Sequence, residues 1–144
     1  MKADVTLLVA EDDPGHAALV ERNLRRAEIK NRILRFQDGQ EVLDFLFQPT
    51  VAQVAPAFLL VLDIRMPKVD GIEVLRRIKA DPRLRSMPVV MLTTTDDPEA
   101  IDCCYRLGCS SYVVKPIQAE RFAQTVNRLG QFLSVVEVPT LPAE

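Results

Sequence analysis

The sequence predicts an α/β fold: a five-stranded parallel sheet with strand order 2-1-3-4-5 and five helices covering both of its faces. First, five short apolar runs alternate with five amphipathic segments along the chain. Second, the runs at 5–10 and 58–62 are apolar without alternation, as strands buried on both faces are. Third, 144 residues suffice for one domain with a hydrophobic core.

Several expected elements carry a start or stop signal. Asp13-Pro14 and Asp97-Pro98 are typical of an N-cap followed by a first helical proline, and Gly108 is a typical helix terminator. The expected strands cover residues 5–10, 31–36, 58–62, 88–93 and 111–114. The expected helices cover about 14–27, 38–46, 72–80, 98–107 and 118–133.

Composition and charge exclude several classes of protein. The net charge of -2 argues against a nucleic-acid binder, which would carry a basic stripe. The sequence has no run of about 18 apolar residues, so no membrane span is expected, and its N-terminal run is too brief for a signal peptide. Three cysteines without metal-binding spacing fit a reduced chain and a cytoplasmic location. The one histidine, His16, is expected to face solvent on the first helix.

Four of the five expected strands end on polar residues that together describe a site. Glu11 and Asp12 follow the first strand, Asp63 follows the third, and the fourth and fifth end at Thr93 and Lys115. In the order 2-1-3-4-5, strands 1 and 3 are neighbours, and the order of the sheet reverses between them. Their acidic ends should therefore converge at the edge where ligands bind in open α/β sheets.

The grouped side chains suit phosphoryl transfer. Three carboxylates this close would take up protons unless a cation joined them, and an oxygen-only ligand set suits Mg²⁺. The cation would also neutralise a phosphoryl group arriving at Asp63, whose carboxylate can attack phosphorus to form an acyl phosphate. The new phosphoryl oxygens would accept hydrogen bonds from Thr93 and Lys115, which makes the site a switch.

Each of these residues also has an ordinary interpretation. Acidic strand ends are often N-caps of the following helix, a single threonine is more often a cap, and a single lysine is more often solvated. The functional interpretation is preferred because four independent strand ends agree with one chemistry.

Four stretches make the sequence similar to the receiver domains of two-component response regulators. They are L-V-A-E-D-D-P at 8–14, L-D-I-R-M-P at 62–67 with D-G at 70–71, P-V-V-M-L-T at 88–93, and Y-V-V-K-P at 112–116. The resemblance covers essentially the whole chain and implies a flavodoxin-like or CheY-like fold. It implies a receiver domain at 1–134 and a C-terminal extension at 135–144.

The resemblance also implies roles for residues at the acidic end. Asp63 is implied to be the phosphoacceptor. Asp12, together with Glu11 acting through a water molecule, is implied to hold Mg²⁺. The third protein ligand of this family is a backbone carbonyl two residues after the acceptor, which here belongs to Arg65.

Three further residues match the part of the family that responds to phosphorylation. Thr93 falls on the switch hydroxyl, Lys115 on the lysine, and Tyr112 on the rotating aromatic residue. The resemblance implies a cis bond between Lys115 and Pro116.

Two features narrow the resemblance to the single-domain regulators that work with bacterial phytochrome histidine kinases. One is the connector at 48–56, which is longer than this fold needs. The other is the apolar extension F-L-S-V-V-E-V-P at 132–139. The resemblance implies a homodimer formed through the last helix and the extension. The alternative is that Val136, Val138 and Leu141 fold back onto their own core.

The leading functional hypothesis is a switch that accepts a phosphoryl group from a histidine kinase and changes its protein contacts, without a DNA-binding output domain. An alternative is a Mg²⁺-dependent phosphatase with an aspartyl nucleophile. Such enzymes usually need a second acid two residues later, where this chain has Arg65. A third hypothesis is an interaction module that is never phosphorylated, which would be expected if the acids, Thr93 or Lys115 were missing.

Overall fold

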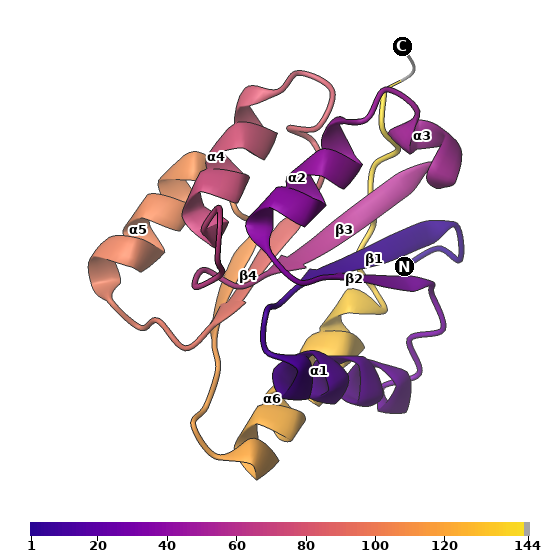
Figure 1. The fold of residues 1–144 in the computed structure, drawn as a ribbon. Helices are drawn as coiled ribbons and strands as arrows, with labels where there is room; N and C mark the ends of the chain where they lie inside the picture. The colour runs from indigo at the N-terminus through magenta and orange to yellow at the C-terminus, as the bar shows by residue number, and fades with distance from the viewer. Residues whose placement is uncertain (143–144) are drawn as a thin grey trace.

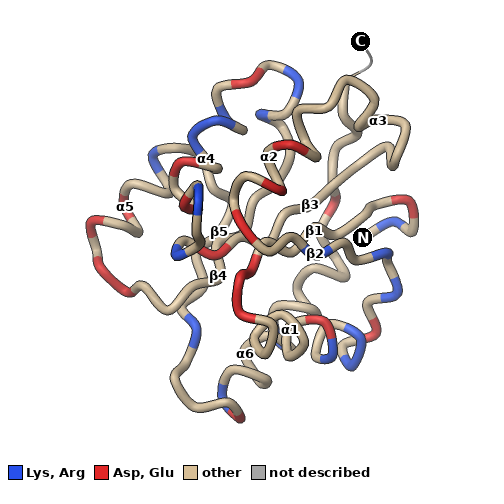
Figure 2. Tube along the Cα trace, in the orientation of Figure 1, with Lys and Arg blue, Asp and Glu red and all other residues tan. Residues whose placement is uncertain are grey.

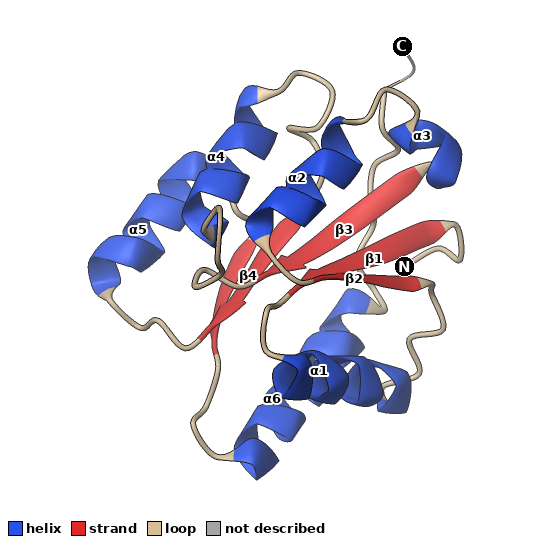
Figure 3. Ribbon diagram, in the orientation of Figure 1, coloured by secondary structure: helices blue, strands red, loops and turns tan. Residues whose placement is uncertain are grey.

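A parallel five-stranded sheet lies between two layers of helices (Figures 1 and 3) in the computed structural model, which describes residues 1–142. The strands are β1 Val5–Ala10, β2 Ile33–Phe36, β3 Ala57–Leu62, β4 Val89–Thr93 and β5 Ser111–Val114. Their order is β2-β1-β3-β4-β5, and every neighbouring pair is parallel. The predicted fold class and strand order are confirmed.

Within residues 1–142 there are six helices, one more than the sequence predicts. They are α1 Pro14–Arg26, α2 Gly39–Phe47, α3 Val51–Val54, α4 Gly71–Ala80, α5 Pro98–Leu107 and α6 Ala119–Leu133. The additional helix, α3, lies in the expected connector at 48–56. It forms because Val51 is fully buried and therefore pulls the connector onto the core.

The helices divide between the two faces of the sheet. Figure 1 shows α1 and α6 together on one face, and α2, α4 and α5 on the other. Each face has its own apolar cluster, because side chains alternate along every strand. Leu7 and Leu59 face α1 and α6, whereas Leu8 and Leu60 face α2 and α4. Strands β1 and β3 are therefore buried on both sides, as their unbroken apolar runs predicted.

The capping signals work as expected. The Asp13 side chain accepts hydrogen bonds from the backbone N–H groups of Gly15 and His16 at 2.8 and 3.1 Å, which begins α1. The Asp97 side chain accepts from Glu99 N–H at 3.1 Å at the start of α5. Gly108 ends α5 at a φ of 109°, a conformation that costs glycine little.

The extension after α6 returns to the core of its own chain. Leu141 is 8% exposed and belongs to the cluster beneath α2 and α4, and its N–H donates to the Pro56 carbonyl at 2.9 Å. Val136 and Val138 are partly buried against the other cluster. The fold-back arrangement therefore describes these three residues, while residues 143–144 of the extension lie outside the described part. No helix within residues 1–142 is long and apolar enough to cross a membrane.

Because Leu141 is buried, the extension should contribute to stability. We expect Leu141→Ala to lower the free energy of unfolding by about 2 kcal/mol through lost apolar burial and the cavity left behind. Urea denaturation measures this change. Ile117→Ala is the control: Ile117 is 99% exposed, so the loss should stay below about 0.5 kcal/mol. Equal effects of the two substitutions would contradict the placement of Leu141 in the core.

Candidate functional site

The register of the two central strands builds an acidic cluster. Ala10 of β1 pairs with Leu62 of β3, so the carboxylates that follow each strand emerge side by side. Asp63 N–H also donates to the Ala10 carbonyl at 3.1 Å, which extends the pairing by one residue. Figure 2 shows the acidic β1–α1 loop in red between the sheet and α1. The cluster thus lies at the carboxyl edge of the sheet, as predicted.

Three carboxylates meet closely enough to share one ion. Glu11, Asp12 and Asp63 each offer one oxygen, and these oxygens all lie within 4.8 Å of one another. Glu11 is 3% exposed and Asp63 is 8% exposed, whereas Asp12 lies open to solvent. An oxygen-only set with one open side fits a hard divalent cation that keeps several waters. The residues therefore suit a divalent metal site.

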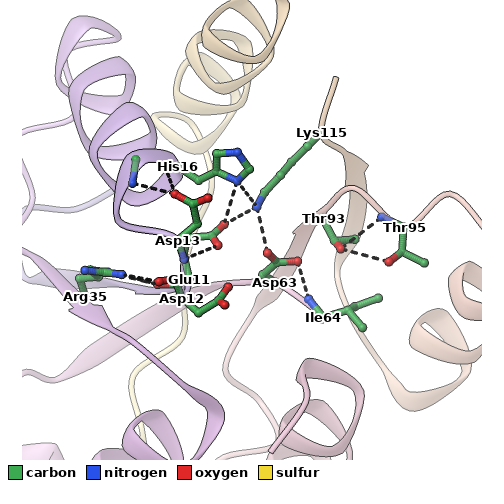
Figure 4. Close-up of polar contacts among 11 residues, drawn as sticks. Glu11, Asp12, Asp13, His16, Arg35, Asp63, Ile64, Thr93, Thr95 and Lys115 are labelled. Atoms are coloured by element: carbon green, nitrogen blue, oxygen red, sulfur yellow. Dashed lines mark hydrogen bonds and ion pairs between the residues drawn. The ribbon is translucent and has the colours of Figure 1, made fainter. Parts of the chain in front are cut away.

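A lysine closes the buried side of this cluster. The Lys115 ammonium is 3% exposed; it donates to Asp63 Oδ2 at 2.9 Å and to Glu11 Oε1 (Figure 4). One ammonium cannot balance three carboxylates, and burial raises the pKa of Glu11 to about 7 despite the hydrogen bond from Lys115. Without a further cation, Glu11 therefore takes up a proton more readily than an ordinary glutamate.

Two glycines fix the loop that follows Asp63. A Cβ on Gly71 would lie 2.0 Å from the backbone oxygen of Asp63, and one on Gly39 would lie 1.9 Å from the Val69 carbonyl oxygen. Both contacts are with backbone, so no larger residue fits. Asp63 Oδ1 meanwhile accepts from Ile64 N–H at 2.7 Å. The Asp63 carboxylate is therefore held from both its backbone and its side chain, with Oδ2 directed at Lys115.

Thr93 and Tyr112 meet at Thr95. The Thr93 side chain is fully buried, and its Oγ1 accepts from Thr95 N–H at 3.3 Å and lies 3.5 Å from the Thr95 hydroxyl. The Tyr112 hydroxyl donates to the Thr95 carbonyl at 2.7 Å, and burial raises the pKa of Tyr112 to about 12. The Thr93 hydroxyl thus engages the loop after β4, whereas Lys115 engages the acids.

Two other sequence-based expectations concern backbone atoms. The side chain of Arg65 is exposed, and the role of its carbonyl as a metal ligand stays a prediction. The bond between Lys115 and Pro116 is trans, whereas the resemblance implied a cis bond.

The expectation for His16 is met only in part, because the residue lies on α1 and is partly exposed but also contacts the site. Its Nδ1 lies 3.3 Å from the Lys115 ammonium and 3.9 Å from Glu11 Oε1, and its ring packs edge-on against Phe122 at 5.2 Å. Its side chain is still 39% exposed, so the residue lies on the rim of the site rather than facing away from it. The Asp13 cap could have indicated this, because it places His16 in the first turn of a helix that begins at the acidic edge.

Sequence reasoning also missed Arg35. This residue lies on the edge strand β2, and its guanidinium donates to the backbone carbonyls of Glu11 and Asp12. No local sequence pattern signals this contact, because it depends on which strand lies beside β1.

Comparison of the chain with known protein families and solved structures agrees with the geometry of the site. The family model of the response regulator receiver domain matches residues 7–127. A crystal structure of a response regulator receiver domain from Rhodospirillum rubrum is 42% identical with a TM-score of 0.90, covering 96% of this chain and 99% of that chain.

Two similar proteins have more specific descriptions. Response regulator Rcp1 of Synechocystis is 32% identical over 95% of this chain and 92% of its own length. Its Mn²⁺-bound crystal structure has a TM-score of 0.84 at 31% identity, covering 96% of this chain and 99% of that chain. The phosphorylated cyanobacterial phytochrome response regulator RcpA is 29% identical with a TM-score of 0.83, covering 93% of this chain and 97% of that chain. With its CheY-like fold, its acidic cluster and a family match across most of its length, the chain belongs to the response regulator receiver family.

Proposed function

We propose that this receiver domain is the phosphoacceptor of a two-component phosphorelay. Asp63 takes a phosphoryl group from a histidine kinase, and the change alters the protein contacts of the domain. The observation that carries the proposal is the position of the Asp63 carboxylate, between two further acids on one side and the buried Lys115 ammonium on the other. A carboxylate in this setting has both a cation site and a positive partner for an incoming phosphoryl group.

The proposed reaction is a phosphoryl transfer without change of oxidation state. An Asp63 carboxylate oxygen forms a bond to phosphorus, the bond from phosphorus to the imidazole nitrogen of the kinase breaks, and the imidazole keeps the electron pair. Asp12, Asp63, the Arg65 carbonyl and, through a water molecule, Glu11 would hold Mg²⁺, which would neutralise charge on the phosphoryl oxygens. Asp63 serves as nucleophile, and Lys115 orients the oxygen that becomes esterified.

The proposed switch uses groups that already share partners. A phosphoryl group on Asp63 offers new acceptor oxygens to the Lys115 ammonium and to the Thr93 hydroxyl. If Thr93 turns toward them, it leaves the N–H of Thr95, and the Tyr112 hydroxyl is bonded to the carbonyl of that same residue. Movement of the loop after β4 would therefore reach Tyr112 and the surface formed by β4, β5, α5 and α6.

The partner we propose is a phytochrome-type histidine kinase in the cytoplasm. Support comes from the similarity to RcpA, described as a phytochrome response regulator, and to Rcp1, which resembles this chain over nearly its full length. The alternatives of an aspartyl phosphatase and of an unphosphorylated interaction module make different predictions for the experiment below.

Incubation with Mg²⁺ and a small phosphodonor should add one phosphoryl group, visible by intact mass. Asp63→Asn should abolish the gain, because an amide is a far poorer nucleophile than a carboxylate. Asp102→Asn is the matched control, since Asp102 is exposed on α5 and does not belong to the acidic cluster. A phosphatase would instead release inorganic phosphate continuously from phosphomonoesters, and an interaction module would gain no mass in the parent chain.

We also propose a homodimer formed through the last helix and the start of the extension. Leu141 is held by its own core, so the contact would use apolar side chains that remain exposed. Phe132 is 55% exposed and Val135 is 75% exposed, and they lie close together where α6 ends. A second copy of the chain is the partner that the resemblance implies for this surface.

Light scattering during size exclusion tests the dimer. The parent chain should show twice the mass of a monomer, and Phe132→Glu combined with Val135→Glu should show the monomer mass, because two charges would be buried without partners. Phe47→Glu is the control, since Phe47 is 39% exposed on α2, across the sheet from α6. If the parent chain is monomeric both with and without phosphodonor, the proposed homodimer is refuted.

The raised pKa of Glu11 gives a stability prediction. Its folded value of about 7 exceeds the ordinary 4.5, so the folded protein binds this proton more tightly than the unfolded chain. Protonated Glu11 therefore contributes to the stability of the fold at pH values below about 4.5, and this contribution is lost as the pH rises through about 7. In chelated buffer, the free energy of unfolding of the parent relative to Glu11→Gln should therefore fall over this range in urea titrations. A difference that grows with pH would contradict the burial effect.

A further inference from the structure

The guanidinium of Arg35 grips the backbone of the loop that carries two of the acids. Its Nε and Nη2 donate to the Glu11 carbonyl at 3.1 and 2.9 Å, and Nη2 also donates to the Asp12 carbonyl at 3.1 Å. Figure 4 shows Arg35 on the opposite side of this loop from Lys115. We propose that Arg35 is a positioning residue for the cation site, an inference that rests on the proposed function.

The two bridged carbonyls belong to successive residues, and both residues carry candidate metal ligands. Fixing these carbonyls fixes the two peptide planes on either side of Asp12, and with them the directions in which the side chains of Glu11 and Asp12 leave the backbone. The planar, forked guanidinium suits this task because it presents several donors in a rigid arrangement. Asp12 depends on it most, since its side chain is exposed.

Among residues 1–142, the other backbone hydrogen bonds of this loop hold its two ends. Glu11 N–H donates to the Phe36 carbonyl at 3.0 Å, as a continuation of the pairing between β1 and β2. At the other end, Asp13 caps α1 and its own N–H donates to Glu11 Oε2 at 3.2 Å. Arg35 contacts the middle of the loop, where its guanidinium donates a hydrogen bond to the Asp12 carbonyl. Its place on β2, opposite Val9 in the register, brings it within reach of the loop.

Two effects of Arg35 on cation affinity have opposite signs. As a fixed positive charge near the site, it should repel a divalent cation, so its removal would tighten binding. As a support for the ligands, it should improve their geometry, so its removal would weaken binding. The charge lies on an exposed side chain that solvent screens, whereas supporting residues around a metal site commonly change affinity by 10- to 100-fold. The geometric effect should therefore prevail.

A substitution series separates charge from hydrogen bonding. Arg35→Lys keeps the charge with a point donor, Arg35→Gln keeps a donor without the charge, and Arg35→Met keeps only the bulk. The Mg²⁺ dissociation constant of the unphosphorylated protein is measured by the NMR shifts of the backbone amides of Glu11 and Asp12. We expect affinity to fall about tenfold in Arg35→Met, with the lysine and glutamine variants between it and the parent.

Several results would overturn the assignment. Tighter binding by the methionine and glutamine variants than by the parent and lysine variants would mean that charge repulsion governs. Unchanged affinity together with a lowered free energy of unfolding would mean that Arg35 only ties β2 to β1. Arg32→Met is the control. Arg32 is also exposed and immediately precedes the same strand. The substitution removes the same charge, and we expect it to leave the dissociation constant unchanged.

The experiment also separates this inference from the proposed function. If the parent chain binds no Mg²⁺, the cation site and the role of Arg35 are both refuted. If it binds Mg²⁺ but gains no phosphoryl group, the proposed function fails while the series still tests Arg35. If the parent binds Mg²⁺ and is phosphorylated on Asp63 but the series is flat, the proposed function stands and only the role of Arg35 is refuted.

Discussion

The repulsion among buried carboxylates at the ends of β1 and β3 is the constraint on which the rest of the structure depends. The pairing of Ala10 with Leu62 leaves Glu11 and Asp63 side by side, and both are more than nine-tenths buried. Burial of like charges is unfavourable unless positive groups join them. Lys115 supplies one such group, and an open side next to Asp12 leaves room for another.

The other contacts of the site follow from the way in which Lys115 neutralises these carboxylates. Lys115 reaches the acids from the end of β5, across β4, so the strand order determines that a residue far away in the chain becomes the partner of Asp63. His16 and Phe122 then surround the lysine from α1 and α6: the imidazole nitrogen lies 3.3 Å from the ammonium, and the Phe122 ring centre lies 5.7 Å from it. A single ammonium thereby links the sheet to both helices of one layer.

Much of this arrangement could be predicted from the sequence, because it depends on local signals and on a small set of allowed topologies. Unbroken apolar runs identified the buried strands, aspartate and proline pairs identified helix starts, and the strand order brought the acidic ends together. Three features were not predicted: helix α3, the contact of His16 with Lys115, and the hydrogen bonds from Arg35 to the β1–α1 loop. Each depends on a contact between segments distant in the sequence, which no local periodicity records.

The C-terminal extension also shows what the sequence alone does not determine. Its apolar residues indicated that a partner surface was needed, but hydrophobicity alone does not say whether that surface belongs to the same chain or to a second copy. The hydrogen bond from Leu141 to Pro56 settles the matter for Leu141, because it places that side chain beneath the connector. Phe132 and Val135 remain exposed.

The close backbone packing at Gly39 and Gly71 makes the two flanks of Asp63 unlike. A side chain at either position would collide with main-chain atoms, so the starts of α2 and α4 pack directly against the turn after Asp63. On the opposite flank, the residues between Thr93 and Asp97 are largely exposed and joined to the sheet by a few hydrogen bonds. A change at the Asp63 carboxylate would therefore meet close backbone packing on one side and an exposed loop with few hydrogen bonds on the other.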